Sequence, residues 1–297
     1  MAFRRAIGVF LILSCGAAFA LQEPQRPRSI GVDVDLVLIN VTVVDHRNRY
    51  VAGLKKENFQ IWEDRVEQEI AYLFTEDAPM SLGIVLDTSG SMKSTIGLAS
   101  RSAGSCIDVG NQDDEYFLVV FSNRPRLLSD FTTEIGTLQS RLLFLEAKGS
   151  TALYDAVYLG LNKLKEGGNP RKALLVITDG YDNNSRYNPS TIREFVREED
   201  IQIFTIGNEG DGMLHELVEL TGGREFRPRG VDGLTGICNQ IVQELKQQYV
   251  IGYRSTNETK DGKWRDVRVR LNVPPGMSKP QVRARSGYYA PDGARRQ

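Results

Sequence analysis

The sequence has few of the residues on which many catalytic centres depend. Among its 297 residues there are only two histidines, His46 and His215, and neither H-E-x-x-H nor G-x-S-x-G occurs. The motifs of a zinc hydrolase and of a serine hydrolase are therefore missing. Charge is balanced, with 37 basic and 38 acidic residues. Without a basic excess, we expect no nucleic-acid partner.

Long apolar runs are also scarce, and the clearest one stands at the start of the chain. A basic beginning, an apolar run over residues 6–20 and an A-x-A site before Leu21 predict a secretory signal peptide over residues 1–20. Cys15 only faintly resembles a lipoprotein site, because Leu13 fits that pattern poorly, so lipid anchoring is disfavoured. We expect a periplasmic or secreted mature chain with net charge −3 and no transmembrane segment.

Only three cysteines occur, and two of them, Cys106 and Cys238, lie beyond the predicted cleavage point. An exported protein can pair such residues. Each of these cysteines, however, is expected to lie on a helix. If the two helices begin at the same edge of the sheet, the positions of the two cysteines along the helix axes differ by about 12 Å, at 1.5 Å per residue. A disulfide requires Cα atoms within about 7 Å. This reasoning predicts two free, buried thiols.

The hydrophobic pattern changes twice along the chain. Apolar residues alternate with period two before Ala78 and again after Gln247, which predicts strands. Between these segments, buried strands alternate with helices, including helices expected over 92–109 and 132–145. Six segments follow: a signal peptide (1–20), a linker (21–28), an N-terminal β segment (29–78), an α/β domain (79–246), a C-terminal β segment (247–290) and a basic tail (291–297).

The α/β segment predicts a doubly wound, mostly parallel sheet with helices on both faces. Each β flank offers no more than about three strands, which are few for an independent core. We therefore predict that the flanks pair into one antiparallel β-sandwich into which the α/β domain is inserted; two separate β appendages are the alternative. Four arginines of the last strands are expected to form a solvated face rather than a surface for an anionic polymer: Arg268, Arg270, Arg283 and Arg285.

A candidate site begins at the end of the strand over residues 82–86. Asp87, Ser89 and Ser91 place oxygen-bearing side chains at alternate positions, and Gly90 lets the backbone turn. Such a pattern suits a hard divalent cation, which takes oxygen ligands. One loop cannot fill the coordination shell of such an ion.

Two later segments supply further oxygens. Thr151 stands before a helical pattern, and Asp179 follows the strand over 173–178. Because the carboxyl ends of parallel strands line one crevice, we expect Thr151 and Asp179 to meet the first loop. Taken singly, these residues are also ordinary helix caps and turn residues.

The motifs D-T-S-G-S-M, G-S-T before a helix and I-T-D-G after a strand resemble, in that order, a von Willebrand factor A domain with a metal-ion-dependent adhesion site. The resemblance implies five metal ligands: Asp87, Ser89, Ser91, Thr151 and Asp179. It also implies a divalent cation, Mg²⁺ before Mn²⁺ or Ca²⁺. A non-enzymatic adhesion role is implied too, in which an Asp or Glu of a partner protein completes the shell.

The loops around this site would set specificity, and we expect contacts from Lys93 to Thr95, from Ala147 and Lys148, and from Tyr181, Asp182 and Tyr187. The wider layout resembles a bacterial family of exported proteins with an A-type domain between β flanks, with counterparts of GLKKENFQIWEDRVEQEI and RSGYYAPD.

Two alternatives stay open. Asp87 to Gly90 also match the D-T-S-G of aspartic proteases, but those enzymes are β-rich and repeat the motif on a facing lobe. The second alternative is a structural module with an unoccupied site.

Overall fold

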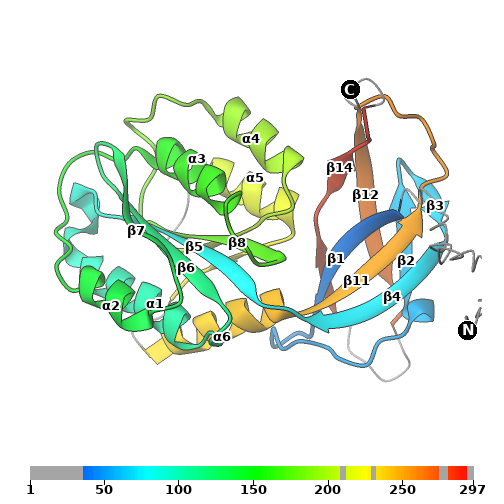
Figure 1. Ribbon diagram of the computed structural model, residues 1–297, viewed down its shortest axis with the longest axis horizontal. Helices are drawn as coiled ribbons and strands as arrows, with labels where there is room; N and C mark the ends of the chain where they lie inside the picture. The colour runs from blue at the N-terminus through cyan, green and yellow to red at the C-terminus, as the bar shows by residue number, and fades with distance from the viewer. Residues whose placement is uncertain (1–35, 208–211, 229–231, 274–279, 293–297) are drawn as a thin grey trace, which may run out of the picture. The chain divides into compact units, whose positions relative to one another are not determined.

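The computed structural model describes residues 36–207, 212–228, 232–273 and 280–292 (Figure 1). The predicted signal peptide, the linker, the first residues of the N-terminal β segment and most of the basic tail lie outside these residues. No helix in the described part of the chain is long and apolar enough to cross a membrane.

The α/β part is built on a six-stranded sheet in the order β10-β9-β8-β5-β6-β7. All pairs in it are parallel except β6 with β7, which closes one edge as an antiparallel strand. This confirms the expected mostly parallel sheet. Its strands are β5 (Met80–Asp87), β6 (Glu115–Phe121), β7 (Pro125–Thr132), β8 (Arg171–Ile177), β9 (Gln202–Ile206) and β10 (Arg224–Phe226).

Helices cover both faces of this sheet (Figure 1). One face packs against α1 (Ile96–Asp108), α2 (Ile135–Leu142) and α6 (Asp232–Lys246). The other face packs against α3 (Leu153–Leu164), α4 (Pro189–Glu198) and α5 (Gly212–Thr221). The central strand β5 is buried along its whole length, so the loop that follows it is held by the core.

Two expected helices are shorter than the pattern indicated. The segment after the first site loop begins as a 3-10 helix, η2 (Gly90–Ser94), and α1 starts only at Ile96. The helix expected over 132–145 is confined to α2, because β7 continues to Thr132 and the chain leaves the helix at Leu143.

The two β flanks combine, as predicted, into antiparallel sheets that mix strands from both ends of the chain. The sheets have the orders β13-β1-β11-β4 and β14-β12-β2-β3. The strands of these two sheets are β1 (Leu36–Val44), β2 (Phe59–Glu63), β3 (Val66–Gln68), β4 (Ile70–Asp77), β11 (Gln247–Arg254), β12 (Trp264–Leu271), β13 (Gln281–Ala284) and β14 (Gly287–Tyr289). A 3-10 turn, η1 (Lys56–Asn58), precedes β2.

One hydrophobic core joins the two β sheets. It contains Ile39 of β1, Ile61 of β2 and Ile251 of β11, each at most 1% exposed. Strand β11 begins at Gln247, directly after the last residue of α6. The buried ammonium of Lys246 lies 2.6 Å from the Asp114 carboxylate, which also accepts the Met80 N–H at the start of β5. Asp114 thus ties together both points where the chain passes between the α/β part and the sandwich.

The predicted solvated arginine face is only half correct. Arg268 is exposed, but Arg283 lies 3.4 Å from Glu244 of α6, a carboxylate that also pairs with Arg224. Burial is the main cause that lowers the pKa of Arg283 below its ordinary value. The expectation counted strand alternation alone, whereas this face of β13 packs against a helix.

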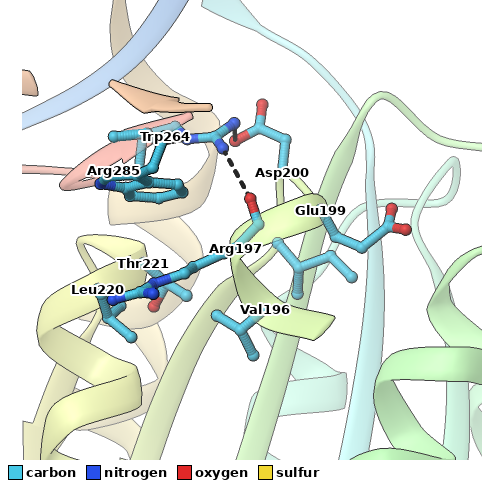
Figure 2. Close-up of a pocket in the computed structure, with 10 residues that line it drawn as sticks. Val196, Arg197, Glu199, Asp200, Leu220, Thr221, Trp264 and Arg285 are labelled. Atoms are coloured by element: carbon cyan, nitrogen blue, oxygen red, sulfur yellow. Dashed lines mark hydrogen bonds and ion pairs between the residues drawn. The ribbon is translucent and has the colours of Figure 1, made fainter. Parts of the chain in front are cut away.

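Arg285 also contacts the α/β part, as Figure 2 shows. Its guanidinium donates to the carbonyl oxygen of Arg197 at 3.5 Å and lies 3.6 Å from the Asp200 carboxylate. The Arg197 guanidinium lies over the Trp264 ring, 5.1 Å from its centroid. The pocket among these side chains is only about 10 Å³, so it reads as a packing gap.

The predicted free thiols are wrong. Cys106 of α1 and Cys238 of α6 form a disulfide with a Cα–Cα distance of 4.6 Å, and both residues are fully buried. The expectation counted Cys106 from Met92, where the helix was expected to begin and which lies inside η2. Counted from Ile96, the two cysteines differ by four helical positions, or about 6 Å. A modest offset between the helix starts is therefore enough to bring them together.

Candidate metal site

Asp87 ends the central strand β5 and is fully buried. One carboxylate oxygen accepts the Ser89 N–H at 2.7 Å, and the other accepts the Thr178 hydroxyl at 2.6 Å. Burial raises the pKa of Asp87, while the hydrogen bonds from Thr178 and Ser89 act in the opposite direction. The carboxylate is therefore held in one orientation from both sides.

A chain of oxygens leads from the first loop to the third. The hydroxyls of Ser89 and Ser91 lie 3.0 Å apart, and the Ser91 hydroxyl donates to the Asp179 carboxylate at 2.9 Å. Asp179 lies just beyond the end of β8, the neighbour of β5 in the sheet. Parallel pairing of these strands thus brings Asp179 to the serines, as the sequence predicted.

Thr151 joins this group from the second loop. A Cβ atom added at Gly180 would lie 3.8 Å from the Ser91 hydroxyl oxygen and 4.0 Å from the Thr151 hydroxyl oxygen. Both hydroxyls therefore border the same small space, next to the residue that follows Asp179. The structure thus brings all five predicted site residues together from three loops.

Backbone hydrogen bonds join the first and second loops. The Gly90 N–H donates to the Gly149 carbonyl at 2.9 Å, and the Lys148 N–H donates to the Thr88 carbonyl at 2.8 Å. Gly149 has a φ of +87°, and a Cβ there would lie 2.7 Å from the Asn123 side-chain oxygen. Glycine is required at this position for both reasons.

Asn183 holds Thr151 and was not predicted from the sequence. Its side-chain oxygen accepts the Thr151 N–H at 2.8 Å, and its own N–H donates to the Thr151 carbonyl at 3.0 Å. Asn123 similarly accepts the Ser150 N–H at 2.7 Å. Two asparagines among turn residues gave no distinctive signal, because such residues commonly serve local turns.

Asp182 and Tyr187, expected to contact a partner, also have contacts within the chain, and Tyr187 remains 36% exposed. Asp182 accepts the Leu153 N–H at 2.9 Å and so caps α3 from outside the helix. The Tyr187 ring stacks on Tyr158 with centroids 4.1 Å apart. Tyr181 is 60% exposed and keeps the expected orientation toward solvent.

The donor set is two carboxylates and three hydroxyls. Within the described ranges, no group of three or more His, Cys, Asp or Glu side chains gathers as a metal cluster. The site has no nitrogen or sulfur ligand and thus differs from a zinc site. Its all-oxygen composition suits a hard cation such as Mg²⁺, which is typically held by one or two carboxylates and retains several waters.

Comparison with known proteins agrees with this architecture. Residues 82–181 match the family model described as the von Willebrand factor type A domain. No curated protein matches the chain. A von Willebrand factor type A protein from Catenulispora acidiphila is similar in structure, with 11% identity, 87% of this chain and 74% of that chain covered, and a TM-score of 0.51.

Two further structures are similar to part of the chain. Proximal thread matrix protein 1 from the mussel byssus has 15% identity and a TM-score of 0.51, with 62% of this chain and 51% of that chain covered. BatB from Bacteroides thetaiotaomicron has 18% identity and a TM-score of 0.47, with 56% and 98% covered. The α/β part of this chain therefore has the fold of von Willebrand factor type A domains, and residues 82–181 match that family.

Proposed function

We propose that this protein binds a divalent cation, Mg²⁺ most readily, through Asp87, Ser89, Ser91, Thr151 and Asp179. The carrying observation is the continuous contact of Ser89, Ser91 and Asp179 at 3.0 and 2.9 Å. Hydroxyl oxygens have lone pairs that can turn from one another to an ion. Two carboxylates can balance the charge of the cation, and the hydroxyls supply neutral ligands.

We propose further that the bound ion captures an Asp or Glu side chain of a partner protein. Ser91 is exposed, and Asp179 and Gly180 are partly exposed, so the site opens to solvent on this side. Mg²⁺ retains exchangeable waters in sites of this kind, and a carboxylate can replace one of them. The protein would then act as a metal-dependent binding module and not as an enzyme.

The protease alternative finds no support in the contacts of Asp87. An aspartic protease needs two carboxylates that share a proton. Here Asp87 accepts from Thr178 and Ser89, whereas Asp179 accepts from Ser91. The aspartates are therefore occupied by separate hydroxyl and amide donors.

The buried disulfide supports the proposal that the chain is exported. Disulfides persist mainly in oxidising compartments such as the periplasm or the extracellular space. Cys106 and Cys238 are both fully buried and paired, as expected of a structural bridge. We propose a periplasmic or secreted location on this basis.

Calorimetric titration with Mg²⁺ and Mn²⁺ tests the metal site. We expect binding by the wild type, loss of binding in Asp179→Asn, and unchanged binding in Glu146→Gln. The control removes one negative charge from an 81% exposed side chain two residues before Lys148, so it measures the general effect of charge. Absence of binding by the wild type would favour the structural module, and unchanged affinity in Asp179→Asn would refute the ligand assignment.

A further inference from the structure

Two adjacent apolar side chains on the loop before the second site loop are almost fully exposed. Leu143 is 79% exposed and Phe144 is 84% exposed, the highest values among large apolar side chains in the described residues. Single exposed apolar residues need no explanation, but neighbouring ones form a patch that marks interaction sites. The exposed pair Leu143 and Phe144 is therefore a candidate interaction site.

Local packing explains why the pair faces outward. Leu142, the last residue of α2, is buried. Leu145 and Ala147 are partly buried and pack against the hydrophobic core to which α1 and α2 contribute. The chain thus fills the core with the residues on either side of the pair. Leu143 and Phe144 contribute little to that core. Packing within the folded chain therefore does not explain why large apolar residues stand at these two positions.

The pair lies within reach of the candidate metal site. Lys148 contacts Thr88 through its N–H, and four residues span at most about 14 Å between Phe144 and Lys148. Tyr181, 60% exposed, follows Asp179 by two residues, a span of at most about 7 Å. A standard interface covers about 800 Å² on each partner, which corresponds to a disc about 16 Å in radius. One such footprint can include the metal site, the pair and Tyr181.

We propose that the partner carries an acidic side chain flanked by bulky apolar side chains, and that Leu143, Phe144 and Tyr181 contact the apolar part. This inference rests on the proposed function, because the ion takes the carboxylate. Exposed Lys93 on the first site loop adds positive charge and favours an acidic partner segment, whereas the charge of exposed Lys148 is balanced by Glu146 at 3.4 Å. The apolar contacts supply the affinity that one ion and one carboxylate lack, since aromatic anchors near an interface centre dominate binding energy.

Selection from a phage-displayed library of short random peptides tests this inference. Peptides bound to the wild-type protein in Mg²⁺ are eluted with EDTA, sequenced and synthesised. We expect them to combine Asp or Glu with Leu, Ile, Phe, Trp or Tyr. Their affinity should fall at least about tenfold for L143S/F144S and also fall for Tyr181→Ser, as for truncated interface anchors.

Two controls separate this result from other causes. L143S/F144S should keep the wild-type Mg²⁺ affinity, because neither side chain is a proposed ligand. Y72S/F74S changes two exposed apolar side chains of β4, 59% and 43% exposed, and should bind the peptides normally. Unchanged peptide affinity in L143S/F144S, selected peptides without apolar residues, or no EDTA-eluted peptides from a protein that binds Mg²⁺ would each overturn the inference. A wild type that binds no Mg²⁺ would overturn the proposed function itself.

Discussion

The disulfide between Cys106 and Cys238 should make a large contribution to stability, and its removal is the sharpest test of the fold. The bridge joins residues 132 positions apart. In the chain-entropy account, closing a loop of that length in the unfolded state stabilises the folded protein by about 5 kcal/mol, and native bridges typically contribute about 2–5 kcal/mol. At about 2–4 °C for each kcal/mol in a protein of this size class, a contribution of about 2–5 kcal/mol means that reduction should lower Tm by roughly 4–20 °C.

The assay is urea unfolding followed by circular dichroism, on oxidised and on reduced wild-type protein. Reduction keeps both sulfur atoms in the core between α1 and α6, so the difference isolates the cross-link. C106A/C238A serves as a second comparison and should be no more stable than the reduced wild type. Non-reducing peptide mapping should show the two cysteines linked. Equal unfolding free energies of the oxidised and reduced protein, or alkylation of both thiols in the oxidised protein, would refute this reasoning.

Three further variants test the supports of the site and the joint between the two parts of the chain. Asn183→Ala removes the acceptor of the second loop's N–H and should weaken Mg²⁺ binding about tenfold in calorimetry, as other outer-shell losses do; unchanged affinity would contradict its positioning role. Gly149→Ala places a Cβ against Asn123 at a positive φ and should also weaken Mg²⁺ binding, whereas wild-type affinity would show that the loop tolerates the change. Lys246→Met leaves the Asp114 carboxylate buried without its cation and should cost about 3–5 kcal/mol in urea unfolding. A cost below about 1 kcal/mol would show that the pair is not coupled to folding.

The sequence predicted that Asp87 and Asp179 would lie close together, because both lie at the ends of parallel strands. Asp87 and Asp179 follow adjacent buried strands, and strand pairing alone brings such ends together. Thr151 was predicted from its position before α3 and through the family resemblance, and it also lies at the site. Neither the residues that hold it nor the exposed pair at 143–144 were predicted, because their roles depend on contacts between loops.

The errors arose where the pattern along one element was used without the contacts between elements. The cysteine prediction assumed a continuous helix from residue 92, and the 3-10 turn of η2 changed the count. The arginine prediction used strand alternation without the neighbouring helix, which buries Arg283 beside Glu244. Each error involves packing between elements that no single segment encodes.

The most direct test of the metal site is a crystal of the full protein grown with Mn²⁺ and measured at the manganese absorption edge. We expect one anomalous peak between the hydroxyl oxygens of Ser89, Ser91 and Thr151, with Asp87 and Asp179 bound to the ion directly or through water. An anomalous peak elsewhere, or none in a crystal whose three loops are ordered, would contradict the account.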